Sequence, residues 1–299
     1  MRNKYLTYLN ERFPLQSHIP IIAIFSFSAI CYALSADGAT QFVSAAHYLA
    51  AFLLTATTFF LLRISDEFKD HEDDMLYRKY LPVPRGLITL RELKHIAWGV
   101  LLFQAILLFF FPQFLITYLV SIGYMTLMYH EFFVAEWLKK HQIAYVLSHM
   151  AIIPLVDLVA SAAYWATDGG YPPKALVWFF LVSFFNGMVL EFGRKIKSPE
   201  MEEEGVVSYT KLYGLKGGVF LWLAVLTVTL ISAFVAAKQI NSPSWVYICF
   251  LSLYGVALVV ALAFLQKPGK KRSKAIEIVS GVWTLGMYLN IGALPFILQ

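Results

Sequence analysis

The chain has 299 residues, of which 59% are hydrophobic and 14% charged, with a mean hydropathy of +0.64. This composition excludes a soluble domain of this length, because too much apolar surface would face water. The formal net charge of +5 comes from basic residues spread over many segments, without the interleaved basic patches of nucleic-acid-binding proteins. We therefore expect contact with anionic membrane lipid and no nucleic-acid partner.

Apolar segments long enough to cross a bilayer as helices recur along the chain. They predict an all-α polytopic membrane protein, a bundle of nine transmembrane helices in one membrane-embedded domain, residues 1–299. Only Pro112 and Gln113 separate the third segment from the fourth. The nine segments are residues 18–36, 43–63, 95–111, 113–130, 143–164, 174–192, 217–237, 244–265 and 276–297.

The positions of lysine and arginine predict the orientation, because short cytoplasmic loops retain positive charge. With the N-terminus inside, every basic residue except Lys174 and Lys238 falls in a cytoplasmic segment. Nine helices then place the C-terminus outside. The sequence thus predicts a multi-pass protein of the cell membrane with a cytoplasmic N-terminus.

Two of the predicted cytoplasmic loops, residues 63–94 and 191–216, are long, carry charges of both signs and contain the acidic clusters of the chain. We call them the first and the second motif segment. They follow the second and the sixth predicted helix, as a weak duplication of a four-helix unit would place them. We therefore expect the two segments to face each other over one cavity, with an active site facing the cytoplasm.

The first motif segment contains a D-x-x-x-D-x-x-x-D ladder formed by Asp66, Asp70 and Asp74. On one helix these carboxylates would lie one above another, about 12 Å from first to last. Three aligned carboxylates repel each other unless cations lie among them, and hard oxygen ligands suit Mg²⁺ carrying a phosphorylated substrate. The ladder therefore predicts a catalytic Mg²⁺ site, while a solvated charged segment is the simpler alternative.

The ladder and the stretch that follows it, Tyr77-Arg-Lys-Tyr-Leu-Pro-Val-Pro-Arg-Gly86, resemble the first aspartate-rich motif of the UbiA superfamily of intramembrane prenyltransferases. That motif reads N-x-x-x-D-x-x-x-D and continues with a basic, proline-containing stretch ending in glycine. Asp66 stands where the family commonly has Asn, and Leu81 stands where an Arg often precedes the Pro-x-Pro segment. Nine helices with motif loops after the second and the sixth are similar to the family over the whole chain.

The second motif segment departs further from the family pattern. Family members usually carry a second aspartate ladder there, whereas residues 191–214 contain no Asp. Arg194 and Lys197 fall close to the expected acidic positions, and Glu191 is the nearest carboxylate able to face the first ladder. The chain thus resembles a divergent branch in which positive charge partly replaces one metal-binding side. The frame of the family motif survives at Gly205, Ser208 and Gly214.

The resemblance implies transfer of a prenyl group from a polyprenyl diphosphate to a hydrophobic acceptor, aromatic or a quinone precursor, with release of pyrophosphate. Mg²⁺ on the ladder would neutralise the charge of the leaving group, helped by Glu191 as a further catalytic carboxylate. Arg and Lys would complete a phosphate clamp, although each basic residue could equally set topology or contact lipid. The substrate-binding candidates are Arg63, Arg78, Lys79, Arg85, Arg194, Lys195 and Lys197.

A carbocation-like allyl group also needs a dry, electron-rich chamber. Tyr124, Tyr129 and Tyr209 are the aromatic candidates, although aromatic residues at such positions more often serve packing or the membrane interface. His130 could touch the acceptor or be an ordinary interfacial residue. Asp157, inside the fifth predicted helix, could orient or deprotonate an acceptor or lie near the outer interface.

Two other classes of protein stay open. A membrane transporter would place charges near the midplane and break its helices at symmetric positions. This sequence shows few such features. A non-catalytic member of the same fold, acting as a lipid-binding or scaffold subunit, would explain the altered second motif segment.

Overall fold

The computed structural model describes residues 3–167 and 169–298, which form α-helices and short 3₁₀ or π turns without a strand. The turns are η1 (Pro112–Phe114), η2 (Glu131–Phe133), η3 (Pro199–Met201) and the π turn η4 (Leu289–Ala293). The helices are α1 (Lys4–Arg12), α2 (Leu15–Ala36), α3 (Ala45–Lys69), α4 (His71–Tyr77), α5 (Leu90–Phe110), α6 (Leu115–Tyr129), α7 (Ala135–Lys140), α8 (Gln142–Met150), α9 (Ile152–Trp165), α10 (Leu176–Arg194), α11 (Tyr209–Gln239), α12 (Ser244–Gln266), α13 (Lys270–Tyr288) and α14 (Leu294–Ile297).

In the described part of the chain, 8 helical segments are long and apolar enough to cross a membrane by length and composition. They coincide with eight of the nine predicted segments, so an all-helical, multi-pass membrane protein is confirmed. The remaining segment, residues 113–130, contains α6, whose 15 residues fall short of the roughly 20 that a straight span needs. The count of nine and the orientation of the termini stay predictions.

Local sequence signals set several helix ends. Thr89 and Glu92 form a capping box at the start of α5, and the Ser208 hydroxyl accepts the Lys211 N–H at the start of α11. Pro154 cannot donate the backbone hydrogen bond that would continue α8 into α9, so one membrane segment consists of two helices.

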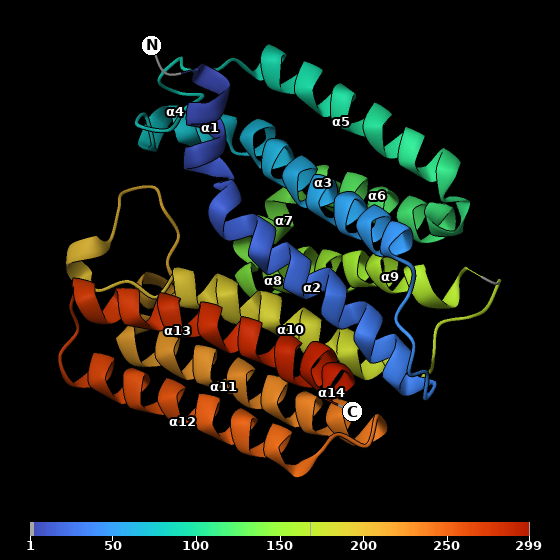
Figure 1. Cartoon of the computed structure of the whole chain (residues 1–299). Helices are drawn as coiled ribbons and strands as arrows, with labels where there is room; N and C mark the ends of the chain where they lie inside the picture. The colour runs from blue at the N-terminus through green and yellow to red at the C-terminus, as the bar shows by residue number, and fades with distance from the viewer. Residues whose placement is uncertain (1–2, 168, 299) are drawn as a thin grey trace.

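The helices form two groups, which Figure 1 shows above and below α2. Below it, α10 packs on α11 and α13, and α12 packs on the same two helices. Above it, α3 packs on α5 and α9, and α6 packs on α9. Since α2 packs on both α9 and η4, it joins the groups. Both motif segments lie at the left end in Figure 1, which we call the motif end.

Small residues allow α2, α9 and η4 to pack closely in the part of the bundle away from the motif end. A Cβ atom on Gly292 of η4 would lie 2.4 Å from the carbonyl oxygen of Ser28 in α2, too close for any larger residue. Ala29 and Ala160, which are fully buried, lie in the same interior. Small side chains allow helix backbones to approach closely in membrane proteins, and here they bring α2, α9 and η4 together.

A polar cluster joins three helices inside the bundle. The Ser183 hydroxyl of α10 donates a hydrogen bond to the Asp157 carboxyl group of α9 and lies 2.6 Å from the Tyr288 hydroxyl of α13. Asp157 and Ser183 are fully buried. Asp157 therefore lies inside the bundle, and its hydrogen bond helps to hold α9 and α10 together.

Candidate active site

The aspartate ladder crosses a helix boundary, which corrects the expectation of one continuous helix. Asp66 lies in the last turn of α3, Asp70 is the residue between α3 and α4, and Asp74 lies in α4. The Asp70 N–H still donates to the Asp66 carbonyl and the Asp74 N–H to the Asp70 carbonyl, each at 2.9 Å. The helical spacing is thus nearly kept, but the three carboxylates have different surroundings.

Arginine side chains relieve the repulsion within the ladder. Arg63 Nη1 lies 3.5 Å from Asp66 Oδ2, and Arg78 Nε lies 2.7 Å from Asp74 Oδ1. Burial raises the pKa of Asp74, and the Arg78 guanidinium opposes this shift. Asp70 forms no ion pair with any residue that the structure describes. Two predicted phosphate ligands therefore pair with the outer carboxylates of the ladder, Asp66 and Asp74.

Helix α1 folds over the first motif segment through ion pairs that the sequence did not reveal. Arg12 donates to Glu67, which is 1% exposed and also lies 3.4 Å from Arg63. Arg85, a predicted phosphate ligand, instead donates to Glu11 at 2.8 Å. The hydrogen bond from Arg85 lowers the pKa of Glu11. Arg85 is thus partly exposed and paired with α1, whereas Glu67 is a buried carboxylate that the sequence analysis did not single out.

The second motif segment presents two cations beside one carboxylate. Glu191 lies 2.6 Å from both Arg194 Nη2 and Lys195 Nζ, so each of its oxygens has a basic partner. Arg194 is also near enough to Asp66 to interact with it electrostatically. Lys197 contributes its backbone N–H to the Thr210 hydroxyl at 3.0 Å. Glu191, Arg194 and Lys195 together carry a net positive charge, and Arg194 faces the ladder.

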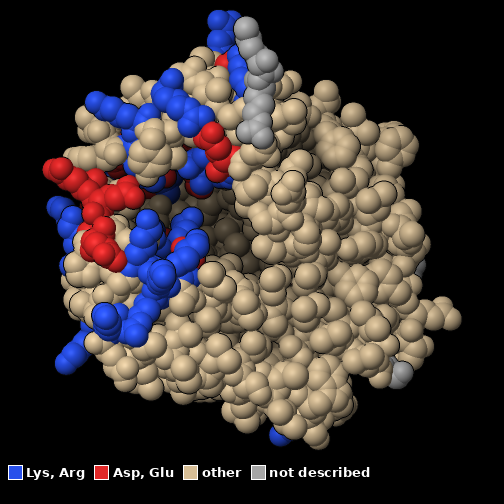
Figure 2. Space-filling model, turned by 60° about the vertical axis from the view of Figure 1, so that its left-hand side comes forward, with Lys and Arg blue, Asp and Glu red and all other residues tan. Residues whose placement is uncertain are grey.

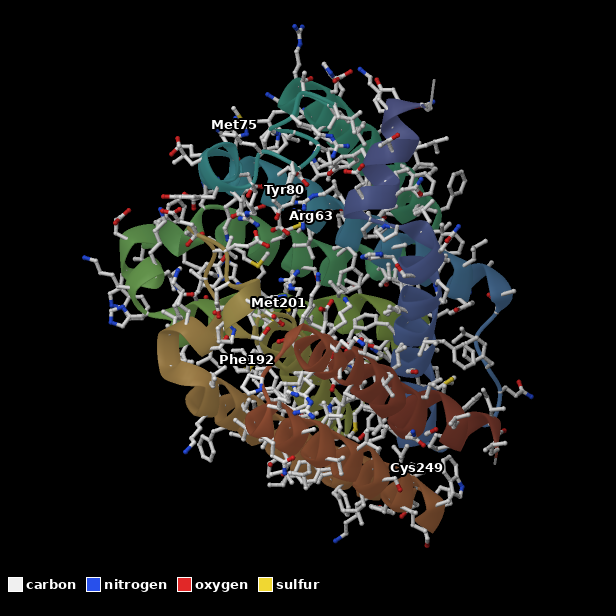
Figure 3. The ribbon with its side chains drawn as sticks, turned by 90° about the vertical axis from the view of Figure 1, so that its left-hand side faces the viewer. Arg63, Met75, Tyr80, Phe192, Met201 and Cys249 are labelled. Atoms are coloured by element: carbon white, nitrogen blue, oxygen red, sulfur yellow. The ribbon has the colours of Figure 1, made fainter. Side chains whose placement is uncertain are left out.

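The two motif segments contact each other directly. The Tyr80 hydroxyl donates to Glu203 at 3.2 Å. Gly205 has a φ of +71°, and a Cβ atom there would lie 2.3 Å from the Tyr77 ring, so glycine is needed for this contact. Figure 3 labels Arg63, Tyr80 and Met201 around the centre of this end of the bundle. The ladder and the basic second motif segment therefore border the same opening.

A further cluster surrounds Lys69, which lies inside the ladder sequence. Lys69 Nζ lies 2.6 Å from the Tyr145 hydroxyl, 3.0 Å from His149 Nε2 and 3.0 Å from Glu131 Oε1. All residues of 131–133 have positive φ values between 50° and 61°, which cost non-glycine residues about 1–2 kcal/mol each. The ion pair holds this strained turn against α3. The sequence analysis did not predict this cluster, because its members are far apart in the sequence.

The predicted aromatic residues do not gather at one point. The Tyr124 hydroxyl donates to the Ser148 carbonyl at 2.6 Å, and Tyr209 is a buried core residue. Tyr129 is 40% exposed and lines a groove on the outer side of α3, and His130 is exposed beside it. Lys79 is also exposed. None of these placements tests their predicted roles in substrate binding.

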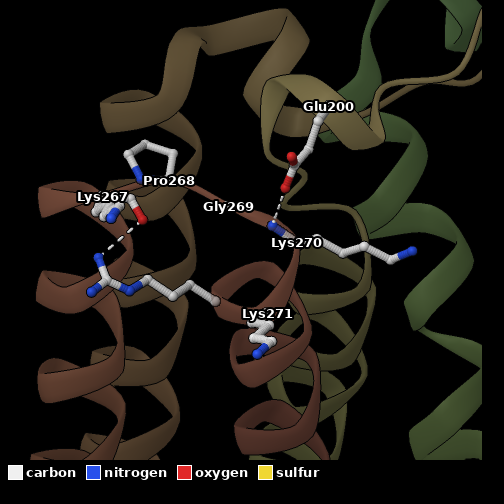
Figure 4. A pocket seen from close by; sticks show the side chains of 7 residues that line it. Glu200, Lys267, Pro268, Gly269, Lys270 and Lys271 are labelled. Carbon is white, nitrogen blue, oxygen red and sulfur yellow. Dashed lines mark hydrogen bonds between the residues drawn. The ribbon is translucent and has the colours of Figure 1, made fainter.

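The motif end is hollowed. Figure 2 shows the hollow between groups of basic and acidic side chains. Among the described residues, no three His, Cys, Asp or Glu side chains lie together closely enough to form a ready metal cluster. A second, shallow pocket of 360 Å³ lies beside the α12–α13 turn (Figure 4), where Glu200 accepts the Lys270 N–H.

Comparisons with known proteins extend the description of the fold. No protein-family model and no curated protein matches the chain. A solved structure of a digeranylgeranylglyceryl phosphate synthase in membranes has a similar fold, with a TM-score of 0.63 and 19% sequence identity. The similarity covers 96% of this chain and 98% of that chain. The chain therefore has the fold of a membrane enzyme over nearly its whole length.

Proposed function

We propose that the protein transfers a prenyl group from a polyprenyl diphosphate to a hydrophobic acceptor, aromatic or a quinone precursor, and releases pyrophosphate. The observation that carries the proposal is that Arg194 lies within electrostatic range of Asp66 and, together with Lys195, pairs with Glu191 at the hollowed end of the bundle. The fold supports it, because the synthase with the similar fold is a membrane prenyltransferase. We assign the hollow to the cytoplasmic side, since both motif segments carry dense positive charge.

In this reaction the bond between C1 of the allylic group and a diphosphate oxygen breaks, and its electron pair leaves with pyrophosphate. The acceptor forms a bond to C1 and loses a proton. Arg194 and Lys195 would meet the negative charge on the leaving group, Arg with a bidentate fork and Lys as a point charge. Arg63 and Arg78 would hold the ladder in place through their existing ion pairs.

The donor set of the ladder fits Mg²⁺. Asp70 has no ion-pair partner among the described residues, and the buried Asp74 carboxylate pairs there with Arg78. Mg²⁺ is usually held by one or two carboxylates together with substrate phosphates, so a ready cluster of three ligands is not required. Bound by Asp70 with Asp66 or Asp74, Mg²⁺ would supply neutralisation of the phosphate charge.

The decisive experiment measures pyrophosphate release by the purified protein in lipid, with labelled polyprenyl diphosphates of several lengths, Mg²⁺ and a lipid-soluble extract. We expect a labelled lipophilic product, and an Asp70→Asn variant should lose about 100-fold or more in turnover, the scale of one electrostatic contact in a transition state. Asp73→Asn is the matched control, because Asp73 is exposed on α4.

Three results would decide against the proposal. Absence of pyrophosphate release with every donor would favour a lipid-binding or scaffold role. Equal turnover in the Asp70→Asn and Asp73→Asn variants would separate catalysis from the ladder. Flux of a substrate across the membrane that is unaffected by either variant would indicate a transporter.

A further inference from the structure

An open groove on the outer face of the bundle lies apart from the motif-end hollow. It measures 540 Å³ and is lined by α3, α5 and α6. Ligand pockets in proteins have volumes of about 300–1,000 Å³. Its lining residues are Leu61, Ile64, Ser65, Phe68, Lys94, Ala97, Trp98, Leu101, Met125 and Tyr129.

Helix α5 is attached to the bundle at two separate points. Near its start, Leu93 is fully buried in a cluster with Ile64. Eleven residues later, Gln104 donates to the hydroxyls of Thr57 and Thr58 and accepts a hydrogen bond from Tyr118 at 2.7 Å. Between these points Ile96 and Ala97 still pack on the Leu93 cluster, but α5 is the least buried of the candidate spans, with 11% of its apolar window buried.

The groove and the aspartate ladder use opposite faces of α3. At about 100° per residue, positions 61, 64, 65 and 68 share one face of the helix, whereas positions 63, 66 and 70 share the other. A ligand in the groove would therefore contact the face of α3 opposite to the ladder. It would not enter the hollow between the motif segments.

The dimensions of the groove fit one lipid chain. The distance along α5 from Leu93 to Gln104 is roughly 16 Å at the α-helical rise per residue. Half of the hydrocarbon core of a bilayer is about 15 Å thick. Leu61, Leu101 and Met125 make the deep part apolar. The space therefore matches a chain that starts at the membrane surface and ends near the midplane.

The polar atoms of the groove gather at its motif end. Lys94 is exposed there, and its neighbour Glu92 pairs with Lys4 instead. No ion pair in the described part of the chain includes Lys94. Trp98 and Tyr129 flank it, exposed by 63% and 40%, as aromatic residues are at membrane interfaces. The ammonium group of Lys94 can therefore bind an anionic group at the motif end of the groove.

We propose that the groove between α3, α5 and α6 binds one chain of an anionic membrane lipid whose headgroup lies against Lys94. The bound lipid fills the gap between the two attachment points of α5 and supports α3 from behind. This inference does not use the proposed transfer reaction, since no group of the groove contacts the ladder face of α3.

The test is native mass spectrometry of the full-length protein equilibrated with equal amounts of phosphatidylglycerol and phosphatidylcholine of the same acyl chains. Wild-type protein should retain phosphatidylglycerol preferentially. Lys94→Met should lower this preference about fivefold, the effect of one basic residue near the surface. Lys139→Met is the control, because Lys139 is exposed at the same end but outside the groove.

A second pair of variants tests the apolar part of the site. Ala97→Phe fills the groove and should reduce retention of both lipids, while Ile106→Phe, on an exposed part of α5 outside it, should bind as the wild type does. A wild type without preference for phosphatidylglycerol, or unchanged retention in Lys94→Met and Ala97→Phe, would overturn the proposal. So would a prenyl diphosphate or a second copy of the chain found in the groove.

Discussion

The contact between the two motif segments can be broken by a single methyl group at Gly205. Gly205→Ala forces an L-residue to a φ of +71°, which costs about 1–2 kcal/mol. That cost alone corresponds to a shift of about 5- to 30-fold in a two-state equilibrium. The new Cβ atom would also lie 2.3 Å from the Tyr77 ring, so the ring must leave its place. We expect residues 199–208 to separate from α4.

Amide hydrogen exchange of the protein in lipid measures this separation. Exchange of the backbone amides in residues 199–208 should accelerate by at least the 5- to 30-fold set by backbone strain. Gly38→Ala is the matched control, because Gly38 has a φ of +68° with no atom within 4 Å of an added Cβ. The donor KM should rise in Gly205→Ala only.

The reasoning fails if residues 199–208 of Gly205→Ala exchange at the wild-type rate. It also fails if Gly38→Ala accelerates their exchange equally, because strain at a distant site would then explain the effect. A Tyr77→Ala, Gly205→Ala double variant separates the two contributions: without the ring, the clash disappears and only the strain remains.

Three further outcomes are expected. Gln104→Leu leaves the buried Tyr118 hydroxyl without its acceptor, so the melting temperature should fall by a few degrees, about 1–2 kcal/mol, and an unchanged value would refute the attachment of α5. Because burial raises the pKa of Asp74 and metal binding needs its ionised form, the Mg²⁺ concentration for half-maximal turnover should rise as the pH falls, and Asp74→Asn should weaken this dependence. Glu191→Gln removes the ion-pair partner of Lys195, so Lys195 should bind the diphosphate substrate and the pyrophosphate product more tightly. In steady-state kinetics both KM for the diphosphate and kcat should therefore fall. An unchanged kcat would contradict this.

The sequence predicted the parts of the fold that depend on composition over about 20 residues. Apolar length defines a membrane helix regardless of its neighbours, so the predicted segments coincide with observed helices. The break at Asp70 was not predictable in this way. Residues 69–74 contain neither Gly nor Pro, so no local signal marks the end of α3 there.

The sequence predicted which charged residues belong to the candidate site, but not all of the residues with which they pair. Asp66 and Asp74 were visible from their spacing, and Arg63 and Arg78 pair with them as neighbours three and four residues away in the sequence. The buried Glu67 depends on an arginine of α1 that lies far away in the sequence. Long-range pairs of this kind follow from tertiary packing, which no local pattern encodes.

The close approach of Gly292 to the backbone of α2 has an electrical consequence. A hollow lined with charges brings water and ions part of the way into the membrane, and a potential of 100 mV is worth about 2.3 kcal/mol for each charge that crosses. Where η4 meets Ser28 there is no room for a methyl group, and so none for a water molecule. The contact between η4 and α2 therefore leaves no path for water or ions at this point of the interior.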